Sequence, residues 1–412
     1  MASKSTRRVL ILGASGLVGT AVLREASRYP ELVCVPATRG VRDGFVSLTF
    51  DTLTTPSTWA KILQDLNVHA VVNCVGIWNG APEQFELIQY QVPAALGLAC
   101  ARLKLHLTHV SALGFKVDSP LPYVSTKARA AQFILDKVPG STIIYPSLIF
   151  GASGQSTRFF MQLATLPVQA DLGYPKNLQP VHVDEVARAI VDSVRGARLE
   201  REIDCAGRVR VNIHEYLASL RTGMGLKRSR LTVTVPRAVT KAMFHWGEKL
   251  GSQFVNRQTC ALLTEGTHSD RDFPTARPYE AYACPDDARQ ALNAWLYGAT
   301  QAGMGVLWLG TAIGRWFFWP REDSLQLLAL LHPSLGTTGW LAASCLLDAA
   351  MGILSFVAPS KRLWKAQFWL TAGYTAGLVL AMPAGLAHPL GLLTKNLCVL
   401  AAQAYLALNE KK

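Results

Sequence analysis

Charged side chains are scarce in this 412-residue sequence. Asp, Glu, Lys and Arg make up 17% of the residues, against roughly 25% in an average soluble protein. The shortage is concentrated after residue 289, where only eight of the 41 Lys and Arg and four of the 28 Asp and Glu occur. This distribution excludes a disordered chain and a chain that is soluble throughout. It indicates a normally charged globular part followed by a part with little charge.

Metal-ligand and disulfide patterns are missing as well. The eight cysteines are scattered without a CxxC pair or a Cys/His cluster, so we expect no metal site, no disulfide scaffold and a reducing compartment for the globular part. No basic stripe interleaved with aromatic residues accompanies the net charge of +13, so we expect no nucleic-acid partner. Lys and Arg beside membrane spans account better for that charge.

Long apolar stretches are present in the last third of the chain. Four of them, 293–318, 338–358, 363–382 and 391–408, are each long enough to cross about 30 Å of hydrocarbon as a helix. They predict an all-α four-helix transmembrane domain, with a buried soluble bundle as the alternative. The loop 359–365 carries three Lys or Arg and no acid, which places this loop and both termini in the cytoplasm.

Two ionisable residues stand out inside these predicted spans, Asp348 in the second and Lys395 in the fourth. Such groups are costly in lipid and usually face a partner or a cavity. Two interpretations remain open: a structural ion pair that holds the bundle together, and a role with protons or substrate.

The chain opens with a strand, a glycine-rich loop and a helix. Arg8–Leu12 is a short apolar run, typical of a strand buried on both faces, and a helical stretch follows at Ala21–Arg28. The loop between them has the form GxxGxxG, which lets a pyrophosphate approach the amides of a helix N-terminus. Its candidate cofactor-binding residues are Gly13, Ser15, Gly16, Leu17 and Gly19.

The end of the next strand bears on the choice of cofactor. Leu32–Pro36 leads into Ala37, Thr38 and Arg39, without an acid. NAD sites usually offer an acid here for the ribose 2′-hydroxyl, whereas an Arg accommodates the 2′-phosphate of NADP. We therefore expect NADP(H) rather than NAD(H).

Strands and helices continue to alternate at the spacing of βα units. Strands are expected at 70–76, 107–111 and 142–146, and helices at 56–66, 83–103 and 123–136. This order predicts an α/β fold with a Rossmann-type, doubly wound parallel sheet. Ligands bind at the carboxyl ends of such strands, where Gly76, Ser111 and Pro146 are found.

Tyr123 and Lys127 form the motif most informative about chemistry. On a helix, the spacing of four places both on one face. An ammonium beside a phenol favours the phenolate and lowers the pKa of the Tyr, so that its hydroxyl can exchange a proton near neutral pH. Ser111, at the end of a strand, can hydrogen-bond the same substrate oxygen. We therefore predict Tyr123, Lys127 and Ser111 as catalytic residues.

Several of these segments together resemble the short-chain dehydrogenase/reductase superfamily, over about residues 7–285. The likeness is to its atypical branch, which includes the NADPH-binding 39-kDa accessory subunit of respiratory complex I. The segments that carry it are Gly13–Gly19, Asn73–Gly76, Ser111–Gly114, Tyr123–Lys127, Tyr145–Gly151 and Gln179–Ala187.

The resemblance implies roles for single residues. Tyr123 would be the general acid/base, Lys127 would bind the nicotinamide ribose, and Ser111 would orient the substrate oxygen. Besides the glycine loop and Lys127, the residues expected to line the cofactor are Arg39, Asp51, Val75, Gly76, Pro146 and Ser147. Three positions depart from the family pattern, with Gln91 for Asn, Tyr145 for Arg and Ala131 for an acid, so substrate class and turnover are less secure than cofactor binding.

The last third of the chain resembles the DoxX-like membrane family. Its closing signature resembles the segment from His388 through Pro389, Lys395 and Asn396 to Leu397. Some members are tied to quinone-linked redox chemistry. Bacterial proteins that join these two modules are expected in the inner membrane, as multi-pass proteins with the N-terminal domain in the cytoplasm.

We expect a domain at 1–285, with a substrate or lid subdomain at about 205–285, and a membrane domain at 290–412. The amphipathic stretch 235–267 predicts a lid, an interfacial helix, or both. Residues 268–285, polar and with three prolines, predict a linker. The second glycine pair, Gly151 and Gly154, is interpreted as a coincidental repeat of the first loop.

Together these features predict a membrane-anchored NADP(H)-dependent oxidoreductase. It would act on a carbonyl or alcohol of a lipophilic, quinone-like or lipid-like substrate. Two alternatives remain: a non-catalytic NADPH-binding anchor or redox assembly factor, and an epimerase or dehydratase that keeps its cofactor.

Overall fold

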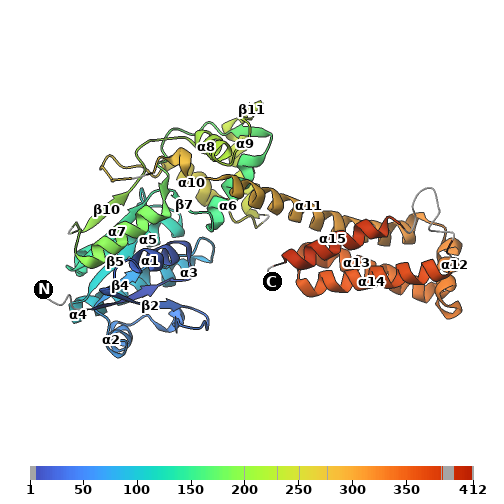
Figure 1. Cartoon of the computed structure of the whole chain (residues 1–412), viewed down its shortest axis with the longest axis horizontal. Helices are drawn as coiled ribbons and strands as arrows, with labels where there is room; N and C mark the ends of the chain where they lie inside the picture. Colours follow the sequence, from blue (N-terminus) through green and yellow to red (C-terminus); the bar gives the residue numbers. More distant parts are fainter. Residues whose placement is uncertain are drawn as a thin grey trace. The chain divides into compact units, whose positions relative to one another are not determined.

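The structure is a computed structural model that describes residues 6–198, 200–229, 231–249, 251–275, 277–381, 383 and 394–410. It divides into two compact units, unit 1 at Met1–Ala291 and unit 2 at Leu292–Lys412. Each unit is described by itself below (Figure 1).

Unit 1 is built on a seven-stranded sheet in which every neighbouring pair is parallel. The strands are β1 Arg7–Leu12, β2 Leu32–Thr38, β3 Val46–Ser47, β4 Ala70–Asn73, β5 His106–Val110, β6 Ser141–Pro146 and β10 Glu202–Cys205. Their order in the sheet is β10-β6-β5-β4-β1-β2-β3. The order reverses between β1 and β4, where Leu12 pairs with Asn73. This reversal is the point at which doubly wound sheets bind ligands, and it confirms the predicted Rossmann-type sheet.

Helices cover both faces of the sheet (Figure 1). One face packs against α2 Pro56–Asp65, α4 Val92–Leu103 and α5 Pro122–Lys137, with Trp59, Leu96 and Ile134 in its core. The other face packs against α1 Leu17–Ala26 and α7 Val183–Arg195, with Val22 and Ile190 in its core. The predicted helix 83–103 is interrupted, because α3 Pro82–Glu86 and α4 are joined by a π-helical turn, η2 Leu87–Gln91.

A smaller subdomain packs around a third core cluster that contains Phe150, Tyr216 and Phe244. Its strands are β7 Ile149–Phe150, β8 Val168–Asp171, β9 Val181–His182 and β11 Leu231–Thr234. Its helices are α6 Gln155–Thr165, α8 Ile213–Gly223, α9 Arg237–Lys249, α10 Arg257–Glu265 and the 3-10 turn η3 Tyr279–Ala281. This subdomain draws on residues from 149 onward, whereas the sequence predicted a start near 205.

The expected linker 268–285 is packed onto the subdomain and the sheet. Phe273 and Tyr282 are buried in two different core clusters. The Ser269 amide donates to the Gln179 side chain at 2.6 Å, and the Tyr282 hydroxyl donates to the Pro180 carbonyl at 3.3 Å. The prediction of a linker was therefore wrong, because two aromatic anchors bind an otherwise polar segment to the domain.

Unit 2 is helical. Its elements are α11 Pro285–Ile313, which begins before the division, the π-helical turn η4 Gly314–Phe318, α12 Arg321–Leu331, the 3-10 turn η5 Pro333–Leu335, α13 Thr338–Val357, α14 Lys361–Ala381 and α15 Asn396–Asn409. Among the described residues, α13 alone is long and apolar enough to cross a membrane, and α15 is a shorter apolar helix. The predicted count of four spans is not confirmed. Residues 384–393 lie outside the described residues. They include 391–393 of the fourth predicted span and 388–393 of the closing signature.

Asp348 is paired inside unit 2, but with Arg315 rather than Lys395. The Arg315 guanidinium donates to Asp348 at 3.3 Å and to the Ser344 hydroxyl at 3.1 Å. Lys395 is exposed at the start of α15. A structural ion pair is therefore present in the bundle, and its cation comes from the π-helical turn η4, inside the first predicted span.

Candidate active site

The glycine loop after β1 closes a turn in which each glycine has a separate steric reason. Gly13 has a φ of +72° and lies against the residue that follows β4. A Cβ on Gly13 would be 3.1 Å from the Cys74 carbonyl carbon. The Gly16 amide donates to the Gly13 carbonyl at 2.9 Å and Gly16 caps α1. A Cβ on Gly19 would lie only 2.3 Å from the Gly13 oxygen. The bare backbone at the start of α1 therefore fits a pyrophosphate.

The end of β2 lies beside this loop. The hydroxyls of Ser15 and Thr38 are 3.2 Å apart, and Arg39 follows with an exposed side chain. Within the described chain Arg39 has no ion-pair partner, so its guanidinium is available to an anion. Asp51 is exposed on the 3-10 turn η1 Phe50–Thr52, and no described hydrogen bond joins it to the other expected cofactor residues.

The turn after β4 is fixed by a buried amide. The Asn73 side chain accepts the Val75 amide at 3.1 Å and contacts His109 Nδ1 at 3.1 Å. This turn presents Gly76 to helix α5, where a Cβ on Gly76 would be 3.3 Å from both Cε and Nζ of Lys127. The absence of a side chain at Gly76 therefore makes room for the lysine.

Lys127 crosses the carboxyl ends of β4 and β5. Its Nζ donates to the Val110 carbonyl at 3.3 Å, and the Ser111 hydroxyl is at the outer limit of a hydrogen bond to the Lys127 carbonyl, 3.5 Å. Burial lowers the pKa of Lys127 to about 8. Burial, reinforced by the Lys127 charge, also lowers the pKa of His109 to about 3, so the lysine is the cation of this site. The structure thus brings Gly76, Ser111 and Lys127 together, as predicted.

Tyr123 lies one turn before Lys127 on α5, which starts at Pro122. Three aromatic rings meet its ring edge to face: Trp78 at 4.8 Å between centroids, Phe115 at 5.3 Å and Phe85 at 5.9 Å. Burial in this cage raises the pKa of Tyr123. The expectation that Lys127 lowers that pKa was therefore wrong for the described structure, because desolvation by the rings outweighs the neighbouring cation.

The aromatic cage continues into the subdomain. The Trp78 indole N–H donates to the Gln253 carbonyl at 2.7 Å, and the Trp78 ring lies 6.5 Å from that of Phe254. Phe254 stacks on Phe159 of α6 at 5.0 Å. The segment between α9 and α10 therefore covers Tyr123 through Trp78, as expected of a lid.

Gln89 is a site residue that the sequence did not single out. It is buried on the π-helical turn, its Nε2 donates to the Thr126 hydroxyl at 3.4 Å, and its Oε1 has no partner among the described residues. That oxygen is 3.9 Å from the Cβ position of Gly76. Gln91, which takes the family's Asn position by resemblance, is exposed. The π turn, which the sequence does not reveal, decides which glutamine points inward.

Pro146 is the last residue of β6, and Ser147 follows it. The Ser147 hydroxyl already makes hydrogen bonds within the domain. It donates to the Thr267 carbonyl, lies 3.0 Å from the Thr267 hydroxyl and accepts the Gln179 amide at 3.3 Å. This hydroxyl therefore fastens the segment after α10 to the sheet. In the described structure it is not directed at the glycine loop.

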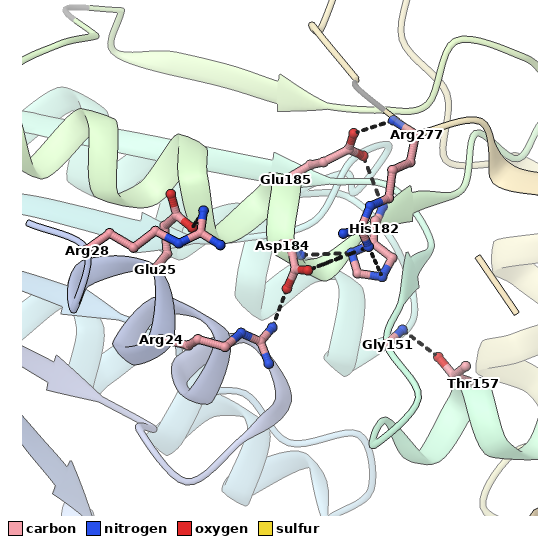
Figure 2. Close-up of polar contacts among 9 residues, drawn as sticks. All are labelled: Arg24, Glu25, Arg28, Gly151, Thr157, His182, Asp184, Glu185 and Arg277. Atoms are coloured by element: carbon pink, nitrogen blue, oxygen red, sulfur yellow. Dashed lines mark hydrogen bonds and ion pairs between the residues drawn. The ribbon is translucent and has the colours of Figure 1, made fainter. Parts of the chain in front are cut away.

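The second glycine pair is part of the site's framework rather than a coincidence. Gly154 caps α6, its amide donates to the Gly151 carbonyl at 2.7 Å, and the Gly151 amide donates to the Thr157 hydroxyl at 3.2 Å (Figure 2). Cβ atoms on Gly151 and Gly154 would lie 2.7 and 2.9 Å from the Leu17 side chain. The two glycines therefore make room for Leu17, the first residue of α1.

A charged cluster holds α1 and α7 together beside this contact (Figure 2). Arg24 of α1 pairs with Asp184, and His182 Nδ1 accepts the Asp184 amide at 3.2 Å at the start of α7. Glu185 accepts the His182 amide at 3.4 Å and the Arg277 amide at 3.2 Å. These contacts fix the helix that carries the glycine loop.

Comparison with known proteins agrees with this division of the chain. Residues 305–404 match the DoxX-like family. The chain is 26% identical over 254 aligned residues to subunit 9 of the NADH dehydrogenase [ubiquinone] 1 alpha subcomplex from Arabidopsis thaliana mitochondria. The match covers 57% of this chain and 61% of that protein. The chain thus spans less than two thirds of that relative.

Two solved structures are similar to part of the chain at low sequence identity. UDP-N-acetylglucosamine 4-epimerase from Bacillus cereus is 14% identical with a TM-score of 0.49, over 69% of this chain and 99% of that chain. dTDP-4-dehydrorhamnose reductase from Bacillus anthracis, solved in complex with NADP, is 15% identical with a TM-score of 0.47, over 57% and 86%. The chain thus carries a DoxX-like domain at 305–404, preceded by a region that is similar in sequence to this NADH dehydrogenase subunit.

Proposed function

We propose that the chain is a membrane-anchored, NADP(H)-dependent oxidoreductase that acts on a carbonyl or alcohol group of a lipophilic substrate. One observation supports this most: Lys127, Ser111 and Gly76 meet at the carboxyl ends of β4 and β5, next to the glycine loop, and Tyr123 lies one turn away on the same helix. When bound, the nicotinamide supplies or accepts the hydride.

The choice of NADP(H) depends on Arg39. It is exposed at the end of β2 beside Ser15, where an Arg suits the 2′-phosphate. No acid of the described chain holds its guanidinium, so this cation can bind the phosphate without first breaking an ion pair.

The proton is assigned to Tyr123. Because burial raises the pKa of Tyr123, the hydroxyl is protonated at neutral pH and can donate to a substrate oxygen that becomes an alkoxide. The Ser111 hydroxyl makes only one described hydrogen bond, a long one to the Lys127 carbonyl, so it can donate to the same substrate oxygen. These protonation states match reduction of a carbonyl.

A lipophilic substrate is favoured by the walls of the site. The rings of Trp78, Phe85 and Phe115 surround Tyr123, and Phe254 extends this surface into the subdomain. Aromatic walls bind apolar groups and exclude water. A substrate that partitions into lipid would meet the enzyme at high local concentration because the chain carries a membrane domain.

A non-catalytic NADPH-binding anchor or redox assembly factor is the second candidate. The named relative is a subunit of NADH dehydrogenase. Moreover, no residue of the described chain hydrogen-bonds the Tyr123 hydroxyl, and its raised pKa disfavours the phenolate. A protein that only senses or stores the cofactor needs no poised phenolate.

Single-turnover oxidation of bound NADPH separates these candidates. The full chain in nanodiscs is loaded with NADPH, mixed with membrane lipid extract, and followed at 340 nm. Wild type should consume the NADPH, and Tyr123→Phe, which keeps the ring but not the hydroxyl, should lose at least about 100-fold in rate. Tyr29→Phe, a Tyr on the other side of the sheet from α5, serves as the matched control.

The other outcomes are equally informative. Binding without consumption in any variant supports the non-catalytic candidate. Substrate conversion without net change in the cofactor indicates an epimerase or dehydratase. No affinity for either NADPH or NADH would overturn the proposal.

A further inference from the structure

Helix α9 carries an apolar stripe that nothing in the described chain covers. Val239, Met243 and Trp246, at positions i, i+4 and i+7, are 55%, 43% and 59% exposed. A different stripe of the same helix, with Thr240 and Phe244 at 1% and 4% exposure, packs into the subdomain core. The buried stripe already anchors the helix to the subdomain, so the exposed stripe is not needed for the helix to pack.

The strand before α9 also exposes apolar side chains. β11 leads into α9 (Figure 1), and its Leu231 and Val233 are exposed. Leu231 pairs with Val168 of β8, which is exposed as well. We call the stripe of Val239, Met243 and Trp246 on α9 the α9 face.

The sequence around α9 is basic. Residues 227–249 contain six Lys or Arg and a single acid, Glu248. Glu248 is neutralised by Arg257, whose guanidinium binds both carboxylate oxygens at 2.7 and 2.9 Å. Lys249 has no ion-pair partner in the described chain, and its ammonium lies 5.0 Å from the centre of the Trp246 ring. Lys241, two positions from both Val239 and Met243, lies on the opposite side of the helix.

We propose that the α9 face docks on the surface of a lipid bilayer that carries anionic headgroups. Trp beside Lys, with a Met and aliphatic residues on the same stripe, is the composition of helices that lie in the interface between headgroups and acyl chains. Lys249, unpaired in the described chain and beside Trp246, complements anionic lipid. The DoxX-like domain at 305–404 keeps unit 1 close to a membrane, so that even weak contacts suffice.

Docking at this face would bring lipid close to the covered Tyr123. Gly247 of α9 packs against Val255, where a Cβ would be 2.3 Å from the Val255 carbonyl oxygen. Gln253 and Phe254, just before Val255, hold Trp78 over Tyr123. This consequence rests on the proposed function, whereas the docking itself does not.

Site-specific photocrosslinking tests the docking without measuring activity. The full chain carries p-benzoylphenylalanine in place of Met243, or in place of Val209 as the control, which is 51% exposed on another loop of unit 1. Each protein is placed in nanodiscs of phosphatidylcholine alone, in nanodiscs containing phosphatidylglycerol, or in detergent. Adducts are identified by mass spectrometry.

We expect lipid adducts at position 243 at a yield at least about fivefold above position 209, and higher with phosphatidylglycerol. Lys249→Glu should remove the gain from the anionic lipid, whereas Lys241→Glu, on the opposite side of the helix, should leave it unchanged. Hydrogen exchange of β1 and β4 reports whether the variants are folded. Adducts to a second copy or to the same chain, equal yields at both positions, or no dependence on headgroup charge would each overturn the proposal.

Discussion

Replacing the buried Lys127 should stabilise the fold and change how its stability depends on pH. Burial lowers the pKa of Lys127 from 10.5 to about 8. One pKa unit corresponds to about 1.4 kcal/mol, so the charged lysine costs the folded state about 3 kcal/mol. Lys127→Met removes that cost but also removes the hydrogen bond to Val110, worth about 1 kcal/mol. The expected net gain at pH 7 is about 2 kcal/mol.

The sign of the pH dependence follows from the direction of the shift. Below pH 8 the lysine is protonated in the folded and unfolded states, and the full penalty is present. Between pH 8 and 10.5 the unfolded chain binds a proton that the folded chain does not, so wild-type stability rises with pH. Above 10.5 both states are neutral and the penalty is gone. The advantage of Lys127→Met should therefore shrink as the pH rises.

Thermal unfolding of the full chain in detergent at pH 7, 8, 9 and 10 measures this difference. Lys127→Met should raise the Tm of unit 1 by about 4–8 °C at pH 7, with most of the difference lost by pH 10. Lys137→Met, at the exposed end of the same helix, is the control and should show no such trend. A difference between Lys127→Met and wild type that stays constant with pH would refute a buried, partly neutral lysine.

Three further experiments test the glycine loop, the choice of cofactor and the ion pair of unit 2. Gly19→Ala places a Cβ 2.3 Å from the Gly13 oxygen and should cost about 1–3 kcal/mol of stability together with NADPH binding, measured by thermal unfolding and fluorescence titration. Gly40→Ala, with nothing within 4 Å, should cost neither. Arg39→Leu should weaken NADPH about tenfold, about 1.4 kcal/mol, and leave NADH unchanged. A double-mutant cycle of Asp348→Asn and Arg315→Gln, by unfolding in nanodiscs, should show at least about 0.5 kcal/mol of coupling.

The central strands of the sheet could be predicted because burial on both faces makes their sequences plainly apolar. β1 contains the apolar run Val-Leu-Ile-Leu, and β4 contains the apolar run Ala-Val-Val. The edge strand β10 was missed because its sequence, Glu-Ile-Asp-Cys, alternates exposed or half-buried acids with buried residues over only four positions. Strands of two to four residues in the subdomain carry too short a pattern to be recognised.

The sequence predicted a subdomain, but its first residue and the packing of residues 268–285 could not be predicted because they depend on a few buried side chains. Phe273 and Tyr282 dock a segment whose prolines and polar residues are typical of a linker. Likewise Leu17 gives Gly151 and Gly154 their purpose, although the two sites are far apart in sequence. The composition of a segment reflects most of its residues, whereas a single buried aromatic ring can determine where the segment packs.

The chemistry of the site was predicted in part, and the missing part has one origin. The spacing of Tyr123 and Lys127 predicted that both lie on one helix, but the environment of Tyr123 comes from rings at positions 78, 85 and 115, which only the tertiary structure brings together. Burial raises the pKa of the Tyr123 phenol and lowers that of the Lys127 ammonium. The protonated phenol suits the proposed donation of a proton better than the abstraction of one.

Trp78 connects the environment of Tyr123 to the lid. Trp78 contacts Tyr123 on one side and is hydrogen-bonded to Gln253 on the other. We expect a displacement of Gln253 to admit water to Tyr123 and to move its pKa back toward the ordinary range. Under the proposed function, one contact would therefore control both the entry of a lipophilic substrate and the readiness of the phenol to donate a proton.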